Sequence, residues 1–121
     1  MKESAVDIGK KYEQAAADYL KNLKYKILEQ NFKLLPVGEI DIIAKDKNTI
    51  VFIEVKYRKN KDFGAPFEFV TKTKQQKIIK TALCYIKKNK IKSDIRFDII
   101  SICGKETEHI KNAFSSGNYY I

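Results

Sequence analysis

Two segments rich in β-branched and aromatic residues lie only three residues apart, and this spacing constrains the fold more than any other feature of the sequence. They are Glu39–Lys45 (EIDIIAK) and Thr49–Arg58 (TIVFIEVKYR), and their composition is typical of β-strands. The residues between them, Asp46-Lys47-Asn48, have the chemistry of a turn. Because parallel strands need a much longer crossover, a link this short allows only an antiparallel hairpin.

The rest of the chain supplies elements that can cover this hairpin. Apolar residues at helical spacing predict helices over Ala5–Leu23 and about Thr73–Lys90. Lys26–Leu34 and Ile95–Cys103 read as further strands. The strand–helix–strand order in the C-terminal half requires a right-handed crossover between parallel strands. The sequence therefore predicts an α/β fold, αβββαβ in order, with a mixed sheet flanked by helices.

Length and composition indicate a single domain with one hydrophobic core. At 121 residues and 44% apolar content, the chain can bury one core, and we expect a single domain over 1–121 with its core at about 5–103. The tail from Gly104 is less regular, and a short helix over His109–Phe114 is one option there. No run approaches the ~20 apolar residues of a membrane helix, and the N-terminus lacks a signal-peptide pattern.

The cysteine and histidine content narrows the chemistry. Cys84 and Cys103 have no CxxC spacing, so we expect reduced cysteines and a cytoplasmic location. The lack of a long apolar run predicts no membrane partner. His109 is the single histidine, which argues against His-rich metal sites and Ser-His-Asp triads.

Positive charge is concentrated in one third of the chain. The formal net charge is +9, and the stretch Val55–Lys92 holds twelve Lys or Arg residues against two acids. A local field of one sign attracts polyanions, most often nucleic acid. The alternative is that these lysines only form a solvated surface.

Acidic residues interrupt both strands of the predicted hairpin. A two-residue or a four-residue connection pairs positions whose numbers sum to 95, which sets Asp41 opposite Glu54 and Glu39 opposite Lys56. A three-residue connection would break this register. Cross-strand Cβ atoms lie about 5 Å apart, so two carboxylates there repel unless a cation neutralises them.

A divalent metal is one solution to that repulsion. The two carboxylates, with the main-chain carbonyl of Val55 between them, are hard oxygen ligands suited to Mg²⁺ or Mn²⁺. The alternative is that both acids are solvated on an exposed face or pair with Lys56 and Arg58. A third acid, Glu13, lies at the edge of the apolar stripe of the first helix, where small neighbours leave open space beside its carboxylate.

The hairpin carries a familiar motif. Asp41 followed by Glu54-Val55-Lys56 resembles the signature of the PD-(D/E)xK nuclease superfamily, and the chain more closely resembles the YraN-like family, which is similar to archaeal Holliday junction resolvases. The matching stretches are GKKYEQAAADYLKNLKYKILEQNFK, GEIDIIA, VFIEVKYRK, FGAPFEFVTKTKQQKI and RFDIISI. The superfamily's proline before the first acid is replaced by Ile40, and Lys33 stands where many relatives have arginine.

The resemblance implies a restriction-endonuclease-like core and metal-dependent phosphodiester cleavage that leaves 5′-phosphate and 3′-hydroxyl ends. Position by position, it implies that Asp41, Glu54 and the Val55 carbonyl hold Mg²⁺ or Mn²⁺ and that Lys56 is the catalytic lysine. Glu13 matches the helical glutamate that completes the metal site in the resolvase-like branch.

The expected function is therefore a metal-dependent endonuclease, structure-selective on branched DNA. The residues expected to grip nucleic acid are Arg58, Lys59, Lys61, Lys72, Lys74, Gln75, Gln76 and Lys77. The two glutamines are included because related nucleases place a polar residue there. The cations are included because they can contact backbone phosphates, and such contacts carry little sequence information. A homodimer would fit junction resolution and a monomer would fit nicking. The alternative function is a non-catalytic nucleic-acid-binding protein that keeps a nuclease fold.

Overall fold

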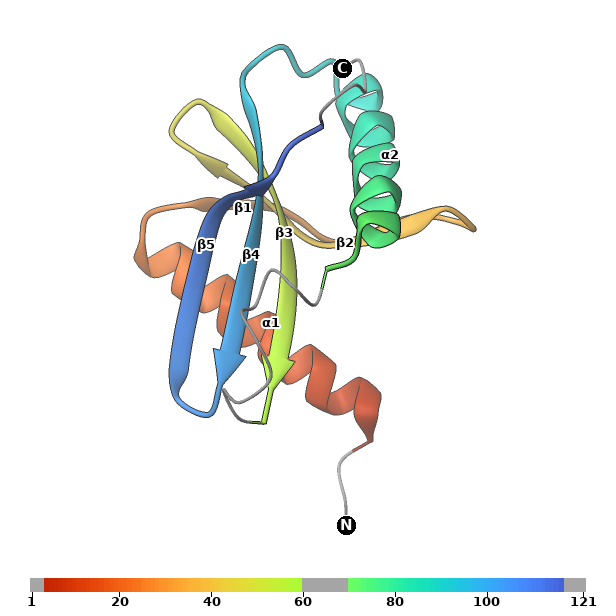
Figure 1. Ribbon diagram of the computed structural model, residues 1–121. Helices are drawn as coiled ribbons and strands as arrows, with labels where there is room; N and C mark the ends of the chain where they lie inside the picture. The colour runs from red at the N-terminus through yellow and green to blue at the C-terminus, as the bar shows by residue number, and fades with distance from the viewer. Residues whose placement is uncertain (1–3, 60–69, 117–121) are drawn as a thin grey trace.

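A computed structural model describes residues 4–59 and 70–116 as a mixed sheet between two helices (Figure 1). The elements in chain order are α1 (Ala5–Asn22), β1 (Lys26–Leu34), β2 (Gly38–Asp46), β3 (Thr49–Arg58), α2 (Lys72–Lys88), β4 (Ile95–Cys103) and β5 (Glu106–Phe114). The five strands follow one another across the sheet in sequence order. The predicted α/β class and the αβββαβ order are confirmed, with β5 added at the end. No helix in the described ranges is long and apolar enough to cross a bilayer.

The β2–β3 hairpin has the predicted register. Asp46 pairs with Thr49 around a two-residue turn, and the pairing continues to Ile42 opposite Ile53, so the two position numbers of each of these pairs sum to 95. Lys47 at the turn has a φ of 57°, which is the left-handed conformation that a tight hairpin turn requires. The hairpin therefore directs Asp41 and Glu54 toward the same face at its open end.

The crossover through α2 brings β4 parallel to β3, as predicted. Lys56 on β3 is the Cα partner of Ser101 on β4. The predicted short helix over His109–Phe114 is wrong: this segment forms the edge strand β5, antiparallel to β4. Backbone groups along β4 need partners, and β5 supplies them, so tertiary pairing overrides a weak local preference.

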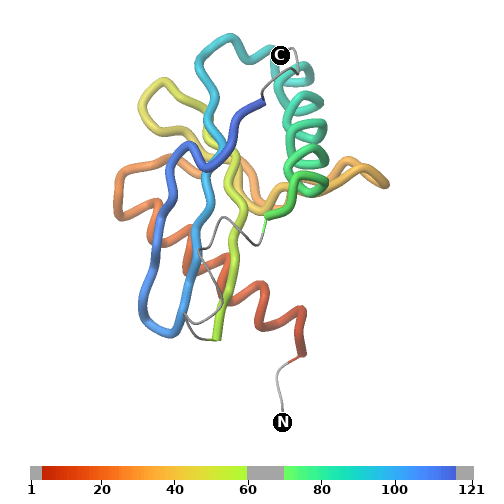
Figure 2. Tube along the Cα trace, in the orientation of Figure 1, coloured from red at the N-terminus to blue at the C-terminus, as the bar shows by residue number. Residues whose placement is uncertain are grey.

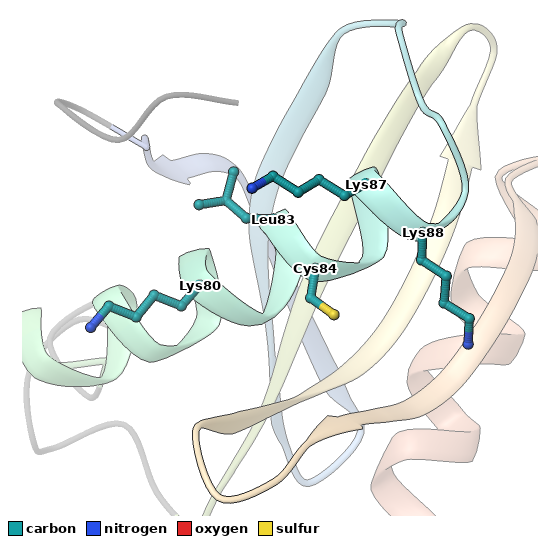
Figure 3. Close-up of a pocket in the computed structure, with 5 residues that line it drawn as sticks. All are labelled: Lys80, Leu83, Cys84, Lys87 and Lys88. Carbon is teal, nitrogen blue, oxygen red and sulfur yellow. The ribbon is translucent and has the colours of Figure 1, made fainter.

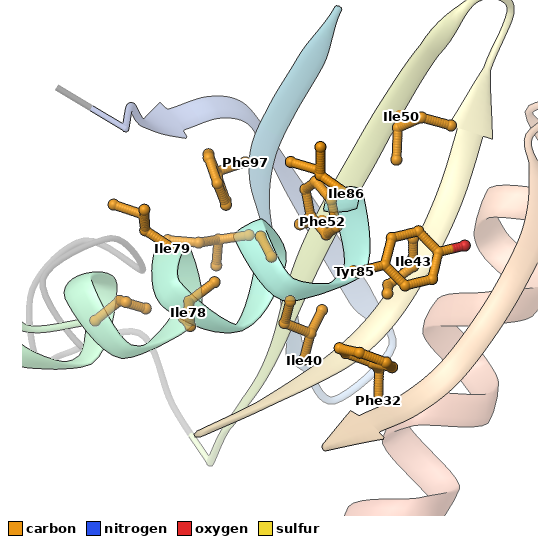
Figure 4. Packing of buried hydrophobic residues seen from close by; sticks show 13 residues of the cluster. Phe32, Ile40, Ile43, Ile50, Phe52, Ile78, Ile79, Tyr85, Ile86 and Phe97 are labelled. Carbon is orange, nitrogen blue, oxygen red and sulfur yellow. The ribbon is translucent and has the colours of Figure 1, made fainter. Parts of the chain in front are cut away.

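Apolar residues cover both faces of the sheet. One core lies between the sheet and α2, where Phe52, Phe97 and Tyr85 make aromatic contacts (Figure 4). The other lies between the sheet and α1, where the fully buried Ala16 and Ala17 allow the helix backbone to approach closely. Each face of the central strands is thus committed to one helix.

One carboxylate is fully buried under α1 and is saturated with donors. Asp98 on β4 has no exposed surface and accepts hydrogen bonds from Arg96 (2.9 and 3.0 Å) and from the backbone N–H of Asn112 (2.9 Å), and it lies 2.7 Å from Nε2 of His109. Burial opposes ionisation, but the contacts with His109 and Arg96 hold the pKa of Asp98 below its ordinary value. This group has the contacts of a structural ion-pair network.

The β1–β2 hairpin is fixed against α2 through Gly38. A Cβ atom at this position would lie 2.9 Å from Oγ1 of Thr81 and 3.2 Å from the carbonyl oxygen of Lys77. The missing side chain lets the start of β2 touch the helix, and the turn before it extends past α2 (gold, on the right of Figures 1 and 2). Gly38 therefore sets the spacing between this hairpin and the helix.

Replacing Gly38 by alanine should lower the melting temperature, because the added Cβ overlaps Thr81 and costs about 1–3 kcal/mol of stability. Gly9 is the matched control, since a Cβ there meets nothing within 4 Å, and Gly9→Ala should raise stability by about 0.5–1 kcal/mol through helix propensity. Thermal melts of both variants test the close approach. Equal effects from the two substitutions would contradict it.

Candidate active site

Two carboxylates from neighbouring strands meet at the open end of the β2–β3 hairpin. The Asp41 Oδ2 atom accepts a hydrogen bond of 2.8 Å from the backbone N–H of Val55, which fixes the aspartate against β3. The half-buried Glu54 carboxyl hydrogen-bonds with the Asp41 carboxylate. The structure thus places these two acids together, as the hairpin register predicted.

The environment of Glu54 disfavours its charged form. Burial, the hydrogen bond to Asp41 and the charge of Asp41 together raise the pKa of Glu54 to about 9, against the attraction of Lys56 and Lys74. A hydrogen bond between two carboxyl groups requires a proton on one of them. Without a cation between the acids, a proton takes that role.

Two lysines lie beside the acids. Lys56 follows Glu54 by two residues on β3 and shares its face. Burial and then its neighbour Lys74 lower the pKa of Lys56, while Glu54 acts in the opposite direction. Lys74 comes from the first turns of α2, so two ammonium groups from different elements flank the carboxylates.

Glu13 on α1 interacts with Asp41 through its charge. Burial raises its pKa, followed by the negative charge of Asp41, and a hydrogen bond with the side chain of Asn31 opposes both. Among residues 4–59 and 70–116, no three His, Cys, Asp or Glu side chains are gathered closely enough to hold a metal ion. Glu13 thus interacts with Asp41 through charge repulsion and is not part of the Asp41–Glu54 pair.

The acids open into a cavity of about 310 Å³ between β2, β3 and α2. It is lined by Gly38, Glu39, Asp41, Glu54, Lys74, Lys77 and Ile78. Of these, Gly38, Glu39 and Ile78 were not among the predicted site residues, and Lys74 and Lys77 were assigned only to nucleic-acid contacts; the predicted Lys56 is not part of the lining. Their spacing of three residues at the start of a helix puts both lysines on one face, and that spacing is the signal that could have placed them together.

The donor set fits a hard divalent cation. Two adjacent carboxylates, one of which carries a proton, together with the carbonyl oxygen between Val55 and Lys56, offer oxygen ligands of the kind that Mg²⁺ and Mn²⁺ prefer. Metal binding displaces protons from its ligands, and the proton between Asp41 and Glu54 is the one to be displaced. The residues present therefore suit such an ion.

The residues predicted to contact nucleic acid differ in their exposure. Lys72, Lys74, Gln76 and Lys77 are on α2 and exposed, and Lys59 is exposed after β3. The Arg58 side chain is mostly buried, with Nη2 at 3.9 Å from Oε2 of Glu108. The Gln75 amide donates to the carbonyl of Val70 at 3.0 Å, so it holds the segment before the helix. Lys61 lies outside the described residues.

Further along α2, the basic surface continues on the outer side of the helix. An open depression of about 560 Å³ is lined by Lys80, Leu83, Cys84, Lys87 and Lys88 (Figure 3). The three lysines extend from the helix into solvent around the half-buried Cys84. Positive charge thus continues from the cavity to the far end of α2.

The sequence has relatives that are named only as members of one protein family. Residues 12–102 match the profile described as "Uncharacterised protein family UPF0102". A UPF0102 protein of Thermodesulfovibrio yellowstonii is 54% identical over 109 residues, covering 90% of this chain and 96% of the relative. One from a Sulfurihydrogenibium species is 45% identical over 88% of this chain and 93% of the relative. One from Francisella tularensis subsp. novicida is 47% identical over 90% and 95%.

Replacing Glu54 by glutamine should stabilise the metal-free protein, increasingly as the pH rises. Folded Glu54 keeps its proton up to about pH 9, whereas the unfolded chain releases it near pH 4.5, so the wild-type protein loses stability between these values. Glutamine has no such proton to lose. Thermal melts in chelator should show Glu54→Gln above the wild type by at least about 3 °C at pH 8 and by less at pH 5.

The exposed strand residue Glu29 provides the control, because Glu29→Gln should leave the melting temperature unchanged at both pH values. A lower melting temperature for Glu54→Gln at pH 5 and pH 8 would show instead that Glu54 is an ion-pair partner of the neighbouring lysines.

Proposed function

The chain belongs to the UPF0102 family, a YraN-like member of the PD-(D/E)xK nuclease-like superfamily, and we propose that it is a metal-dependent endonuclease that cleaves phosphodiester bonds in branched DNA. The observation that carries the proposal is the Asp41–Glu54 pair with Lys56 beside it. Asp41 and Glu54 line a cavity together with Lys74 and Lys77 of α2, and Lys56 is a neighbour of both Glu54 and Lys74. Acids and cations meeting in one cavity suit a phosphate and its counterion.

The residues that would hold Mg²⁺ are Asp41, Glu54 and the carbonyl of Val55. When bound, the ion would supply Lewis-acid stabilisation of the phosphate and activation of the attacking water. Glu13 adds negative potential from α1, since its charge interacts with that of Asp41. The N–H of Val55 keeps the Asp41 carboxylate in place whichever species lies between the acids.

Lys56 is the residue best placed to act on the reacting atoms. Its ammonium group lies on the same face as Glu54, in surroundings that lower its pKa by burial. A preorganised donor in such a place stabilises charge that develops on the phosphate, and it can orient the attacking water. Lys74 and Lys77 hold the adjoining phosphates from the other side of the cavity.

The surrounding positive charge supports nucleic acid as the substrate. It also supports recognition through the sugar–phosphate backbone rather than the bases. Lysines on α2 carry no acidic neighbours in the first helical turn, and lysine–phosphate contacts give affinity without reading bases. This arrangement favours selection by shape, as on branched DNA. Symmetric cutting of a four-way junction needs two sites, so a homodimer is the assembly that would serve it.

Purified protein should cut branched or flapped DNA in Mg²⁺ or Mn²⁺ and lose this activity in chelator. Asp41→Asn should abolish cutting because it removes a charged oxygen ligand, and Lys56→Gln should slow it about 10²–10³-fold by removing the positioned ammonium group. Gel analysis of labelled substrates, with linear duplex beside them, measures both effects.

Asp18→Asn is the matched control for this assay, since Asp18 is exposed on α1 and accepts a hydrogen bond only from Gln14 among the bonds found in the described residues. It should cut like the wild type. Tight, salt-dependent binding without cutting under any divalent metal would support the non-catalytic binding protein, and retention of cutting by Asp41→Asn would exclude this site.

Replacing Lys72, Lys74 and Lys77 together by alanine should flatten the salt dependence of DNA binding. Each lost phosphate contact reduces the slope of log K against log salt by about 0.9, so three contacts reduce it by roughly 2–3. Fluorescence anisotropy over a range of salt concentrations measures the slope.

A variant with Lys21, Lys26 and Lys45 replaced by alanine removes the same charge from exposed positions outside the cavity. Its slope should stay near that of the wild type. Equal slopes in the two triple variants would place the binding surface elsewhere.

A further inference from the structure

The turn between β1 and β2 presents an unusual side chain to solvent. Its sequence is Leu34-Leu35-Pro36-Val37; Pro36 is a common turn residue, whereas leucine is not among the residues that turns favour. Leu35 is 79% exposed, the most of any large hydrophobic side chain in the described residues. Single exposed leucines are common on protein surfaces, but this one stands at the tip of a hairpin that extends past α2 (Figure 1).

This turn is held rigidly. The N–H of Val37 donates to the carbonyl of Leu34 at 2.6 Å, and Leu34 pairs with Gly38 across the base of the hairpin. Gly38 in turn packs against Thr81 and Lys77 of α2. Leu35 is therefore presented in a defined place relative to the helix, rather than on a free loop.

The same turn lies next to the candidate active site. Gly38 and Glu39, which directly follow it, line the cavity with Asp41 and Lys77. Leu35 precedes Gly38 by three residues, so at most about 11 Å of chain separates it from the cavity wall. A nucleic-acid backbone held by the α2 lysines at this cavity would therefore pass within reach of the hairpin tip.

We propose that Leu35 inserts as a wedge into the base stack beside the phosphate held at the cavity. The proposal rests on the proposed function and narrows the substrate to DNA whose stacking is already interrupted. Apolar side chains such as leucine separate neighbouring base pairs in this way. Unstacking costs least where pairing is already broken. A branch point, flap or nick lets the wedge enter, whereas a continuous duplex resists it.

Binding with Ca²⁺ in place of Mg²⁺ tests the wedge without requiring cleavage. The probe is a branched DNA with 2-aminopurine at the branch point, whose fluorescence rises when the base is unstacked, and a continuous duplex of equal length serves for comparison. Wild-type protein should raise the fluorescence and bind the branched DNA more tightly. Leu35→Ser should abolish the rise and weaken binding to the branched DNA about tenfold while leaving duplex binding within about twofold.

Leu23→Ser is the control, because Leu23 is 46% exposed at the end of α1 and should leave both readouts unchanged. Thermal melts establish that the serine variants are folded. A fluorescence rise retained by Leu35→Ser overturns the wedge, as does a change in self-association on sedimentation with unaltered DNA binding, which would assign Leu35 to contact with a second copy.

The two proposals fail separately. Metal-dependent cutting without a Leu35-dependent signal overturns the wedge and leaves the endonuclease. A Leu35-dependent signal in a protein that cuts no DNA supports the wedge and overturns the endonuclease.

Discussion

The two-residue turn at Lys47-Asn48 sets the register on which the rest of the site depends. Pairing from Asp46–Thr49 to Ile42–Ile53 brings the next residues, Asp41 and Glu54, onto one face at the open end of the hairpin. A shift by a single residue would turn one of the two carboxylates to the opposite face. Because β2 and β3 also lie at the centre of the sheet, between β1 and β4, the same register fixes which side chains meet each helix.

Two carboxylates of the central strands, Asp98 and Glu54, differ in charge state because their surroundings differ. Asp98, under α1, is surrounded by the Arg96 guanidinium, the His109 ring and a backbone N–H, and these contacts favour its ionised form. Glu54, on the α2 side, faces another carboxylate, and burial together with Asp41 raises its pKa to about 9. The first group satisfies its charge within the fold. The second keeps a proton that a divalent metal ion could displace.

Close packing of a hairpin against a helix turns this pair of acids into a cavity. Gly38 allows β2 to touch α2 at Thr81 and Lys77, and that contact brings the lysines of the first helical turns opposite the acids. The same contact fixes the Leu34–Val37 turn beside the cavity. The hairpin register forms the acid pair, and the contact of Gly38 with α2 brings the lysines and the exposed Leu35 turn beside it, so we treat the three as parts of the proposed nucleic-acid site.

The sequence by itself determined the elements and the pairing of the hairpin. Strand patterns, helical periodicity and the short Asp46–Asn48 link are local properties, and parity alone sets Asp41 opposite Glu54 once the turn length is known. Only the tertiary structure decided that the tail forms β5, that the Gln75 amide donates to the Val70 carbonyl, and that Lys74, Lys77 and Glu39 share the cavity. These depend on how α2 and β5 pack against the sheet, and packing joins residues far apart in the chain, which periodicity and spacing do not encode.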